Sequence, residues 1–384
     1  MKFIHLSDLH IGKQLHHYSL LEEQRELLDQ IVAHVKKEQP DAVLIAGDVY
    51  DTTVPSAEAI AVLDDFLAKL DGLEQELTIC IIAGNHDSAK RLDYASRILA
   101  KHAIHIVGMP PVTAEEGMKK VSLSDRYGEV VFYLLPFAKP GYLKKLFPEE
   151  TLSFSDSVKR LLEREEVDTS KRNVLVSHQF YAGGGESPVT SDSEVHVVGG
   201  IDNVDVGVLE AFDYAALGHI HRAQKIGAQK NRYSGTIFPY SISEADEKKF
   251  LTMVELGPKG EVPQIRELAL DLPRQVRKLR GKMEEVLAAA GDVMCHDYVS
   301  ITLTDEVEAN HPRERLEEKY DHILEIRIDN ARTRKLLELG EIEMENLAPY
   351  EAFCNFFFEL NGREMTEAED ALLKEVLQEG GDME

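Results

Sequence analysis

The stretch Ala83-Gly84-Asn85-His86-Asp87 follows an apolar run, residues 77–83, that has the length and composition of a buried parallel strand. The glycine permits a sharp turn, which places three polar side chains at the carboxyl end of the strand. Ligands of open α/β sheets bind at that end. An Asn oxygen is a neutral metal ligand, a His is a ligand or a general acid, and an Asp can orient the His. By itself the stretch also suits an ordinary turn, so its meaning depends on the other strands.

Four more apolar runs end in Asp or His in the same way. They are residues 2–6 followed by Asp8 and His10, 42–46 followed by Asp48, 174–177 followed by His178, and 214–217 followed by His219 and His221. Because the carboxyl ends of parallel strands lie at one edge of a sheet, we expect all these side chains to meet at that edge.

Helical and strand-like segments alternate through the first half of the chain, which predicts the α/β class with a parallel sheet. Apolar residues recur with helical spacing over residues 19–37, 56–70, 91–100 and 155–166, and further strands are expected over 130–136 and 250–256. The segment 182–205 is rich in Gly, Ser and Asp, and its length indicates either a functional or a disordered loop. Its glycine run lacks the strand–helix setting of a nucleotide-binding loop.

The chain divides by composition into three parts. Residues 1–269 carry the predicted site and form the first domain. Composition changes near Leu270, and residues 270–340 alternate as strand, helix, strand, helix, strand, which predicts a separate small α/β domain. Residues 341–384 begin with an acidic linker and continue as two amphipathic helices, from Tyr350 to Phe358 and from Met365 to Leu377. Two interpretations of this tail stay open: packing onto the small domain, and docking of a partner protein.

The length of 384 residues predicts more than one domain and a substantial core. The sequence lacks the apolar run of roughly 20 residues that spans a bilayer and begins directly with a strand, so we expect no membrane association and no secretory signal. The cysteines Cys80, Cys295 and Cys354 have neither disulfide nor zinc spacing, which favours a reducing cytoplasm.

The formal net charge of −26 is far from the basic composition of a DNA-binding surface. Acidity does not exclude a phosphodiester substrate, because bound divalent cations reverse the field within a site. Extended contact with the DNA backbone would then come from local basic patches or from a partner protein.

The predicted ligands combine carboxylate, amide and imidazole groups without a thiolate: Asp8, His10, Asp48, Asn85, His178, His219 and His221. This mixture suits Mn²⁺, Mg²⁺ or Fe²⁺ better than a structural zinc. One ion does not need so many ligands, whereas two ions that share Asp48 as a bridge would use them all. Two-metal sites of this kind promote in-line displacement at phosphorus.

His86 is left beside the predicted ligands. It is a candidate catalytic residue that protonates the leaving oxygen or stabilises charge in the transition state. Asp87 is a candidate to hold the ring of His86. Asp51 is expected to cap the turn after Asp48 and not to take part in catalysis.

The first two-thirds of the chain resemble the calcineurin-like metallophosphoesterase superfamily. The resemblance rests on five motifs in the order of the family: Asp8-Leu9-His10, Gly47-Asp48, Gly84-Asn85-His86-Asp87, His178 and Gly218-His219-Ile220-His221. It implies a metallophosphoesterase-type layered sheet core flanked by helices. The residues around the first two motifs and the appended small domain are similar to those of bacterial nuclease subunits.

That narrower resemblance implies an Mn²⁺-dependent DNA exonuclease and endonuclease of DNA repair and recombination, which works with an SMC-like ATPase and often forms a homodimer. It also implies that the small domain caps the site and that the terminal helices bind the ATPase. This chain has Asp51 where archaeal and eukaryotic relatives place a His. The role of that His in handling duplex ends is therefore not carried over.

Two other classes of function remain. One is a phosphatase or cyclic-nucleotide phosphodiesterase with the same site and a small substrate, against which the long C-terminal extension argues. The other is a regulatory scaffold with a vestigial site, against which the complete ligand set argues.

Overall fold

The computed structural model describes residues 1–148, 152–183, 185, 187–194, 202–245, 247–291, 294–307, 311–331, 333–334, 350, 353–354, 357–358 and 363–381. The chain forms two compact units. The first comprises Met1–Lys278 with His296–Ser300, and the second comprises Leu279–Cys295 with Ile301–Glu384. The acidic linker expected at 341–346 lies outside the described residues.

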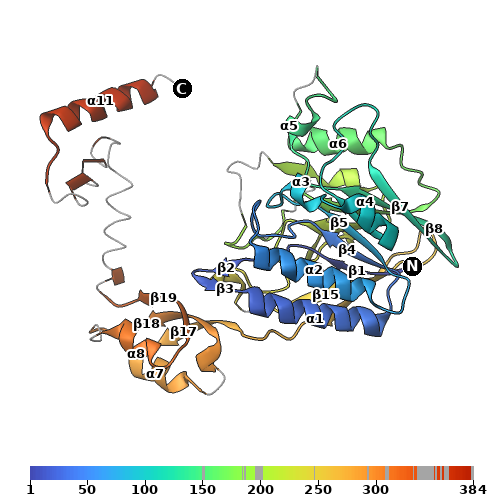
Figure 1. The fold of residues 1–384 in the computed structure, drawn as a ribbon. Helices are drawn as coiled ribbons and strands as arrows, with labels where there is room; N and C mark the ends of the chain where they lie inside the picture. The colour runs from blue at the N-terminus through green and yellow to red at the C-terminus, as the bar shows by residue number, and fades with distance from the viewer. Residues whose placement is uncertain are drawn as a thin grey trace. The chain divides into compact units, whose positions relative to one another are not determined.

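Two six-stranded sheets form the centre of the first unit (Figure 1). The first has the order β16-β15-β1-β4-β5-β6. Its strands are β1 (Lys2–Leu6), β4 (Ala42–Ala46), β5 (Thr78–Ile82), β6 (Ile104–Val107), β15 (Phe250–Glu255) and β16 (Gln264–Ala269). Strands β1, β4, β5 and β6 are parallel, and β15 and β16 add antiparallel strands beside β1.

The second sheet has the order β13-β14-β12-β9-β8-β7. Its strands are β7 (Lys119–Asp125), β8 (Gly128–Leu135), β9 (Arg172–His178), β12 (Tyr214–Gly218), β13 (Gln224–Ile226) and β14 (Ala228–Tyr233). Strands β8, β9, β12 and β14 are parallel. Short strand pairs, β2 (Gln14–Leu15) with β3 (Tyr18–Ser19) and β10 (Phe180–Ala182) with β11 (Asn203–Asp205), lie outside the two sheets.

The expectation that all the Asp- and His-tipped strands share one sheet is wrong. Strands β1, β4 and β5 belong to the first sheet, whereas β9 and β12 belong to the second. The sheets share a core in which Phe3 and Leu44 of one lie with Phe132 and Tyr214 of the other. Strands β4, β9 and β12 are buried along their whole length, so their apolar pattern does not reveal which strand lies beside which.

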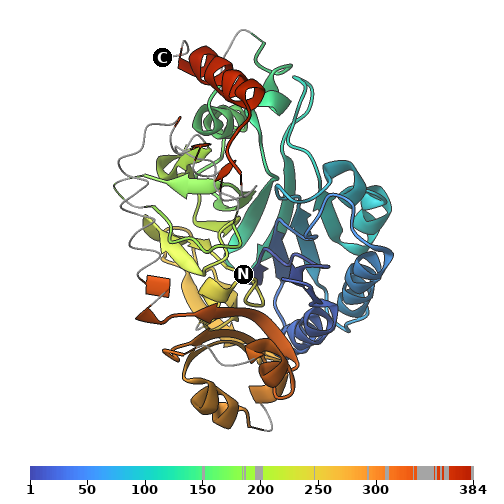
Figure 2. The ribbon, with the colours of Figure 1, turned by 90° about the vertical axis from the view of Figure 1, so that its left-hand side faces the viewer.

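Helices cover the outer faces of the sheets. They are α1 (Leu21–Glu38), α2 (Ala57–Asp71), α3 (Ala89–Leu92), α4 (Ser96–Leu99), α5 (Pro140–Leu143) and α6 (Phe154–Arg164), with 3-10 turns η1 (Ala100–His102), η2 (Val206–Leu209) and η3 (Ile242–Glu244). Figure 2 shows the blue helices α1 and α2 on one flank of the first unit and the green segments on the other.

The predicted helices of the first unit agree with the structure except in one place, and part of the helix expected from Tyr350 to Phe358 lies outside the described residues. Ser56 caps α2, since its hydroxyl accepts the N–H of Ala59 at 3.2 Å. The helix expected over 91–100 is interrupted between α3 and α4, where Ala95 takes a left-handed conformation with φ 61°. A single residue in that conformation ends the regular ladder of helical hydrogen bonds.

The second unit is built on a three-stranded sheet of order β17 (Val276–Gly281), β18 (Tyr298–Leu303) and β19 (His322–Ile328), of which β17 and β18 begin in the first unit. Its helices include α7 (Met283–Ala289), α8 (Pro312–Glu317) and α11 (Glu367–Gly381), with the 3-10 turn η4 (Met294–His296). Thr366 and Glu369 exchange hydrogen bonds at the start of α11, as in a capping box. Among the described residues, none of the helices is long and apolar enough to cross a membrane. Cys80 is a buried free thiol.

Candidate metal centre

The strand ends bring the seven predicted ligands into one region of the first unit. All are buried except Asn85, which is half-buried. Four of the seven have a positive backbone φ, which residues other than glycine rarely adopt. They are Asp8 (53°), His10 (43°), Asp48 (48°) and His219 (97°). Such strain persists only where the surrounding structure over-determines it, and it gathers at functional sites.

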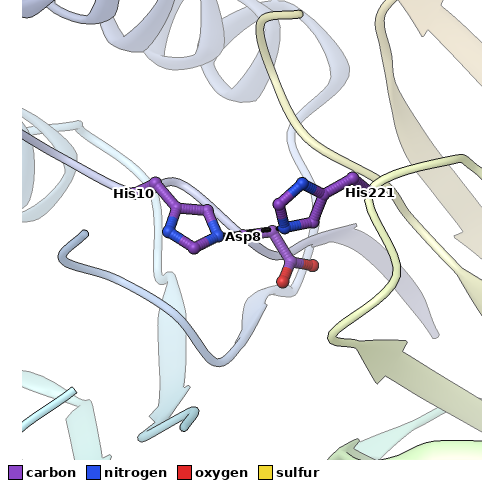
Figure 3. A group of neighbouring side chains, drawn as sticks. All are labelled: Asp8, His10 and His221. Carbon is purple, nitrogen blue, oxygen red and sulfur yellow. Dashed lines mark hydrogen bonds between the residues drawn. The ribbon is translucent and has the colours of Figure 1, made fainter. Parts of the chain in front are cut away.

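One cluster joins Asp8, His10 and His221, whose potential ligand atoms all lie within 4.8 Å of one another. The Nε2 atoms of His10 and His221 are 3.1 Å apart and point toward each other beside the Asp8 carboxylate (Figure 3). The backbone N–H of His219 donates to both Asp8 oxygens, at 3.0 and 3.2 Å, and the Ser7 hydroxyl donates to one of them. Asp8 is therefore fixed in place by its own loop and by the end of β12.

A second cluster joins Asp48, His178 and His219 within the same limit. Asn85 completes it, because its Oδ1 lies 3.1 Å from His178 Nε2 and 2.9 Å from His219 Nδ1. The Nδ1–H of His178 donates to the carbonyl of Ala46 at 2.7 Å. That contact fixes the tautomer, so that Nε2 of His178 is the nitrogen that faces the cluster.

Asp48 lies between the two clusters. Its Oδ2 is 3.2 Å from His178 Nε2 and 3.8 Å from His10 Nε2. Its Oδ1 accepts the backbone N–H of His86 at 2.8 Å. This close fit explains the glycine before Asn85, because a Cβ at Gly84 would come within 2.1 Å of Asp48 Oδ1.

Burial and neighbouring charges act in opposite directions on the acidic groups. Burial raises the pKa of Asp8 to about 8. Burial also opposes ionisation of Asp48, but the adjacent His178 ring outweighs it and holds the pKa of Asp48 well below its usual range. Although burial alone would lower the pKa of His178, the Asp48 carboxylate raises it to about 9.

The facing imidazoles of the first cluster are neutral, because burial lowers the pKa of His10 and lowers that of His221 further. The raised pKa of Asp8 therefore belongs to a buried carboxyl group whose two neighbouring imidazoles carry no charge to stabilise its ionised form. A divalent cation would supply that charge, and oxygen and imidazole donors without thiolate suit hard or borderline ions. The residues present therefore fit a divalent metal centre.

His86 is half-buried beside the clusters, but Asp87 does not hold its ring as expected. The Nδ1–H of His86 donates to the backbone carbonyl of Asp51 at 2.8 Å. The Asp87 carboxylate instead accepts the backbone N–H groups of Val49, Tyr50 and Gly84, at 2.9 to 3.1 Å. Those buried amides need an acceptor, so Asp87 ties the turn after β4 to the turn after β5. Burial raises its pKa to about 6.

The side chain of Asp51, expected to cap a turn, contacts a lysine and a histidine of the site instead. Its Oδ1 accepts a hydrogen bond from Lys13 Nζ at 2.8 Å and lies 3.3 Å from His10 Nδ1. Asp51, His10 and His86 form a third group of possible ligands. The closeness of Asp51 to Asp48 in the sequence is a signal that Asp51 lies near the site. Its pairing with Lys13 has no such signal, because it joins two separate loops.

Sequence reasoning also missed the side chains behind His221. The Ser193 hydroxyl lies 2.6 Å from His221 Nδ1, and the carboxylate of Glu194 accepts the backbone N–H of His221 at 2.7 Å. Glu244 accepts from Ser193 at 2.7 Å and from Lys249 Nζ at 2.8 Å. The only sequence signal for these contacts is the polar composition of the segment 182–205. That composition does not predict which residue each polar side chain contacts.

Comparisons with known proteins identify two families and a relative that this chain matches. The model of the calcineurin-like phosphoesterase family matches residues 1–223. The model described as the type 5 capsule protein repressor C-terminal domain (SbcD_C) matches residues 272–360. The chain is 28% identical over 382 residues to the D subunit of the SbcCD nuclease of Staphylococcus epidermidis, and the match covers 98% of each protein.

Solved structures show more distant likeness. A dimetal phosphatase from Danio rerio is 12% identical with a TM-score of 0.39, and the match covers 70% of this chain and 96% of that one. GAP50 of the Plasmodium inner membrane complex is 12% identical with a TM-score of 0.40, covering 71% and 89%. The family model covers more than half of the chain and includes every residue of the two clusters. The chain therefore belongs to the calcineurin-like phosphoesterase family.

Proposed function

We propose that the chain is the nuclease subunit of an SbcCD-type complex, a metal-dependent DNA phosphodiesterase that acts on DNA ends and hairpins. The observation that carries the hydrolytic part is the position of Asp48 between two buried clusters of oxygen and nitrogen donors. The choice of DNA is supported by the relative named as part of a nuclease, which matches this chain almost from end to end.

Two divalent cations, in our proposal Mn²⁺, would be held by Asp8, His10 and His221 on one side and by Asn85, His178 and His219 on the other, with Asp48 shared. Bound there, they would acidify a water nucleophile and neutralise charge that develops on the phosphodiester. The protein orients the donors beforehand: His178 is fixed by the Ala46 carbonyl, and Asp8 by the amide of His219.

His86 would act on the leaving oxygen. Its Nδ1–H is engaged with the Asp51 carbonyl, so Nε2 is the nitrogen available to a substrate. In the doubly protonated ring, Nε2–H donates its proton to the departing oxygen or stabilises the charge on it. Asp87 is a positioning residue in this proposal, since its carboxylate holds the backbone on either side of the site.

Partners are part of the proposal. An SbcC-like ATPase of the SMC family would bind through the C-terminal helices, where Phe358 and Leu372 are 52% and 61% exposed. Exposed apolar side chains of this kind are typical of protein-binding surfaces. Residues 270–340 would form a capping domain and 341–384 the docking tail. The homodimer that the resemblance implies is tested by measuring the mass of the chain in solution.

The decisive assay compares substrates in the presence of Mn²⁺. Linear duplex DNA and a DNA hairpin are offered beside a chromogenic phosphodiester, and turnover of each is measured with and without a chelator. We expect metal-dependent cleavage of both DNAs at a kcat/KM well above that of the small ester. A small-substrate phosphatase or cyclic-nucleotide phosphodiesterase would show the reverse preference, and a vestigial site would cleave none of them.

The partner is tested separately by co-purification with the ATPase. Phe358→Ser and Leu372→Ser should each weaken the association while leaving the nuclease rate of the isolated chain unchanged. Val262→Ser is the matched control, because Val262 is 73% exposed in the first unit. Equal retention of the ATPase by all three variants would contradict docking through the tail.

A further inference from the structure

The imidazole of His221 is held from behind by a side chain of a different segment. Its Nδ1 lies 2.6 Å from the hydroxyl oxygen of Ser193, which is 28 residues earlier in the chain. The neighbouring Glu194 accepts the backbone N–H of His221 at 2.7 Å. The hydroxyl oxygen of Ser243 accepts the N–H of Asp192 at 3.0 Å and so anchors the same segment.

The direction of the hydrogen bond between Ser193 and His221 follows from Glu244. Glu244 is fully buried, and its carboxylate accepts from Lys249 Nζ at 2.8 Å. It also accepts from the hydroxyls of Thr236 at 3.1 Å and Ser241 at 3.0 Å. A buried carboxylate that is paired with an ammonium and surrounded by donors is ionised, and an ionised carboxylate only accepts hydrogen bonds.

Ser193 has a single hydroxyl proton, and the Oε1 atom of Glu244 lies 2.7 Å away to receive it. The oxygen of Ser193 is then left with lone pairs on the side of His221, so His221 Nδ1 must be the donor in that contact. A neutral imidazole with its proton on Nδ1 has a lone pair on Nε2. That nitrogen faces His10 Nε2 and the Asp8 carboxylate in the first cluster.

Two of the other ligand imidazoles, those of His178 and His10, have different supports. His178 donates its Nδ1–H to the fixed backbone carbonyl of Ala46 at the end of β4. His10 has its Nδ1 against the carboxylate of Asp51. His221 instead depends on a hydroxyl, and that hydroxyl is set by a buried carboxylate on a third segment.

We propose that Ser193, backed by Glu244, is a positioning residue of the metal centre that keeps the proton of His221 on Nδ1 and leaves Nε2 free to bind a divalent cation. The cation part of this inference rests on the proposed two-metal centre. Partners of this kind, which orient a metal-binding imidazole from behind, typically change metal affinity about 10- to 100-fold when they are removed.

The first measurement reads the tautomer of His221 directly. The chain is labelled with ¹⁵N at histidine and prepared free of metal, long-range ¹⁵N–¹H correlation spectra are recorded, and His221 is assigned from the His221→Gln variant. We expect the Nδ1–H tautomer in the parent chain and a shift toward the Nε2–H tautomer in Ser193→Ala. Ser193→Thr keeps the hydroxyl and should restore the parent pattern.

The second measurement is a calorimetric titration of the same variants with Mn²⁺. In Ser193→Ala one of the two sites should weaken by about 10- to 100-fold, and Ser193→Thr should retain most of the affinity. Ser243→Ala is the matched control, since it removes the anchor of the same segment but no contact with His221. It should leave the tautomer and both affinities unchanged.

Two results would overturn the inference: an unchanged tautomer with two undiminished sites in Ser193→Ala, or an equal loss in Ser243→Ala and Ser193→Ala. The second result would mean that anchoring of the segment matters and the hydroxyl does not. Failure of the proposed metal centre is distinguishable from both. The parent chain would then bind no Mn²⁺, although the tautomer of His221 would still respond to Ser193→Ala.

Discussion

At the residue scale, the site is built from strained backbone that its own hydrogen bonds support. Asp48 has φ 48° and follows Gly47, which has φ 91°. A Cβ at Gly47 would come within 2.2 Å of the His178 ring. The strained turn is held by Asp87, whose carboxylate accepts hydrogen bonds from the backbone N–H groups of Val49 and Tyr50. The cost of the strain is thus offset by contacts that also fix the position of the Asp48 carboxylate.

The first prediction concerns the bridging position of Asp48. Asp48→Ala should weaken Mn²⁺ binding at both sites and abolish hydrolysis, because its carboxylate faces His10 and His178 alike. Asp8→Ala should mainly remove one site, since Asp8 belongs to a single cluster. Calorimetric titration with Mn²⁺ measures both effects. Asp64→Ala, on the exposed face of α2, is the control, and two intact sites in Asp48→Ala would rule out the bridge.

The second prediction separates chemistry from metal binding at His86. The contact of His86 with Asp48 is made by its backbone N–H, which a His86→Gln variant keeps. We therefore expect this variant to bind two Mn²⁺ ions and to lose about 10²- to 10⁴-fold in kcat, as for a missing general acid. His102→Gln is the matched control, at a side chain that is 59% exposed. Near-parental turnover in His86→Gln would reduce His86 to a structural role.

At the element scale, the loop after β14 carries a buried ion pair that joins η3 to the residue just before β15. Lys249 is 5% exposed and Glu244 is 0% exposed, and their charged atoms are 2.8 Å apart. Burial opposes ionisation of Glu244, but the Lys249 ammonium outweighs it and lowers the pKa of Glu244 below its usual value. The stabilisation from this carboxylate is therefore present above its unfolded pKa of about 4.3 and is lost as the pH falls below it.

The third prediction tests that pair by its free energy of unfolding. Lys249→Met should destabilise the fold by about 3–5 kcal/mol at pH 7, because it leaves a buried carboxylate without its cation. The double variant Lys249→Met with Glu244→Gln should recover part of that loss, since it removes the unpaired charge and keeps an acceptor for the neighbouring hydroxyls. Lys69→Met is the control: Lys69 is 41% exposed, and its exposed pair contributes about 1 kcal/mol or less. Chemical denaturation measures the free energy of unfolding of all three variants. An equal loss in Lys69→Met would mean that the buried pair stabilises the fold no more than an exposed pair does.

The strand ends were predictable from the sequence because each pairs an apolar run with an Asp, His or Asn directly after it. The helix cap at Ser56 was predictable for the same local reason. The division into two sheets was not, because β9 and β12 are buried along their whole length, as β4 is. Nor were the partners of Asp87 and Ser193, which lie 37 and 51 residues away at Tyr50 and Glu244. Those contacts depend on how loops meet in space, which local patterns do not encode.

At the scale of the whole molecule, the net charge of −26 sets how the chain meets a polyanion. Negative charge over the surface repels a duplex, and that repulsion is screened within about 10 Å at 0.1 M salt. Within the site the sign is reversed only where cations are bound. The isolated chain is therefore expected to engage a few phosphates beside its metal centre and to lack a broad basic surface.

The fourth prediction is the salt dependence of DNA binding. Each phosphate that a basic group neutralises releases counterions, so the logarithm of the binding constant falls with the logarithm of the salt concentration by about 0.9 for each such contact on duplex DNA. We expect a slope no steeper than about −3 for the isolated chain and a clearly steeper one when the ATPase is added, since the partner would supply the missing basic groups. Fluorescence anisotropy with a labelled duplex, in Ca²⁺ to prevent cleavage and over a series of KCl concentrations, measures both slopes.

The Phe358→Ser chain with the ATPase is the control and should keep the shallow slope. A steep slope for the isolated chain would mean that its own lysines and arginines form a duplex-binding surface despite the acidic total, and the ATPase would then not be needed to hold the DNA.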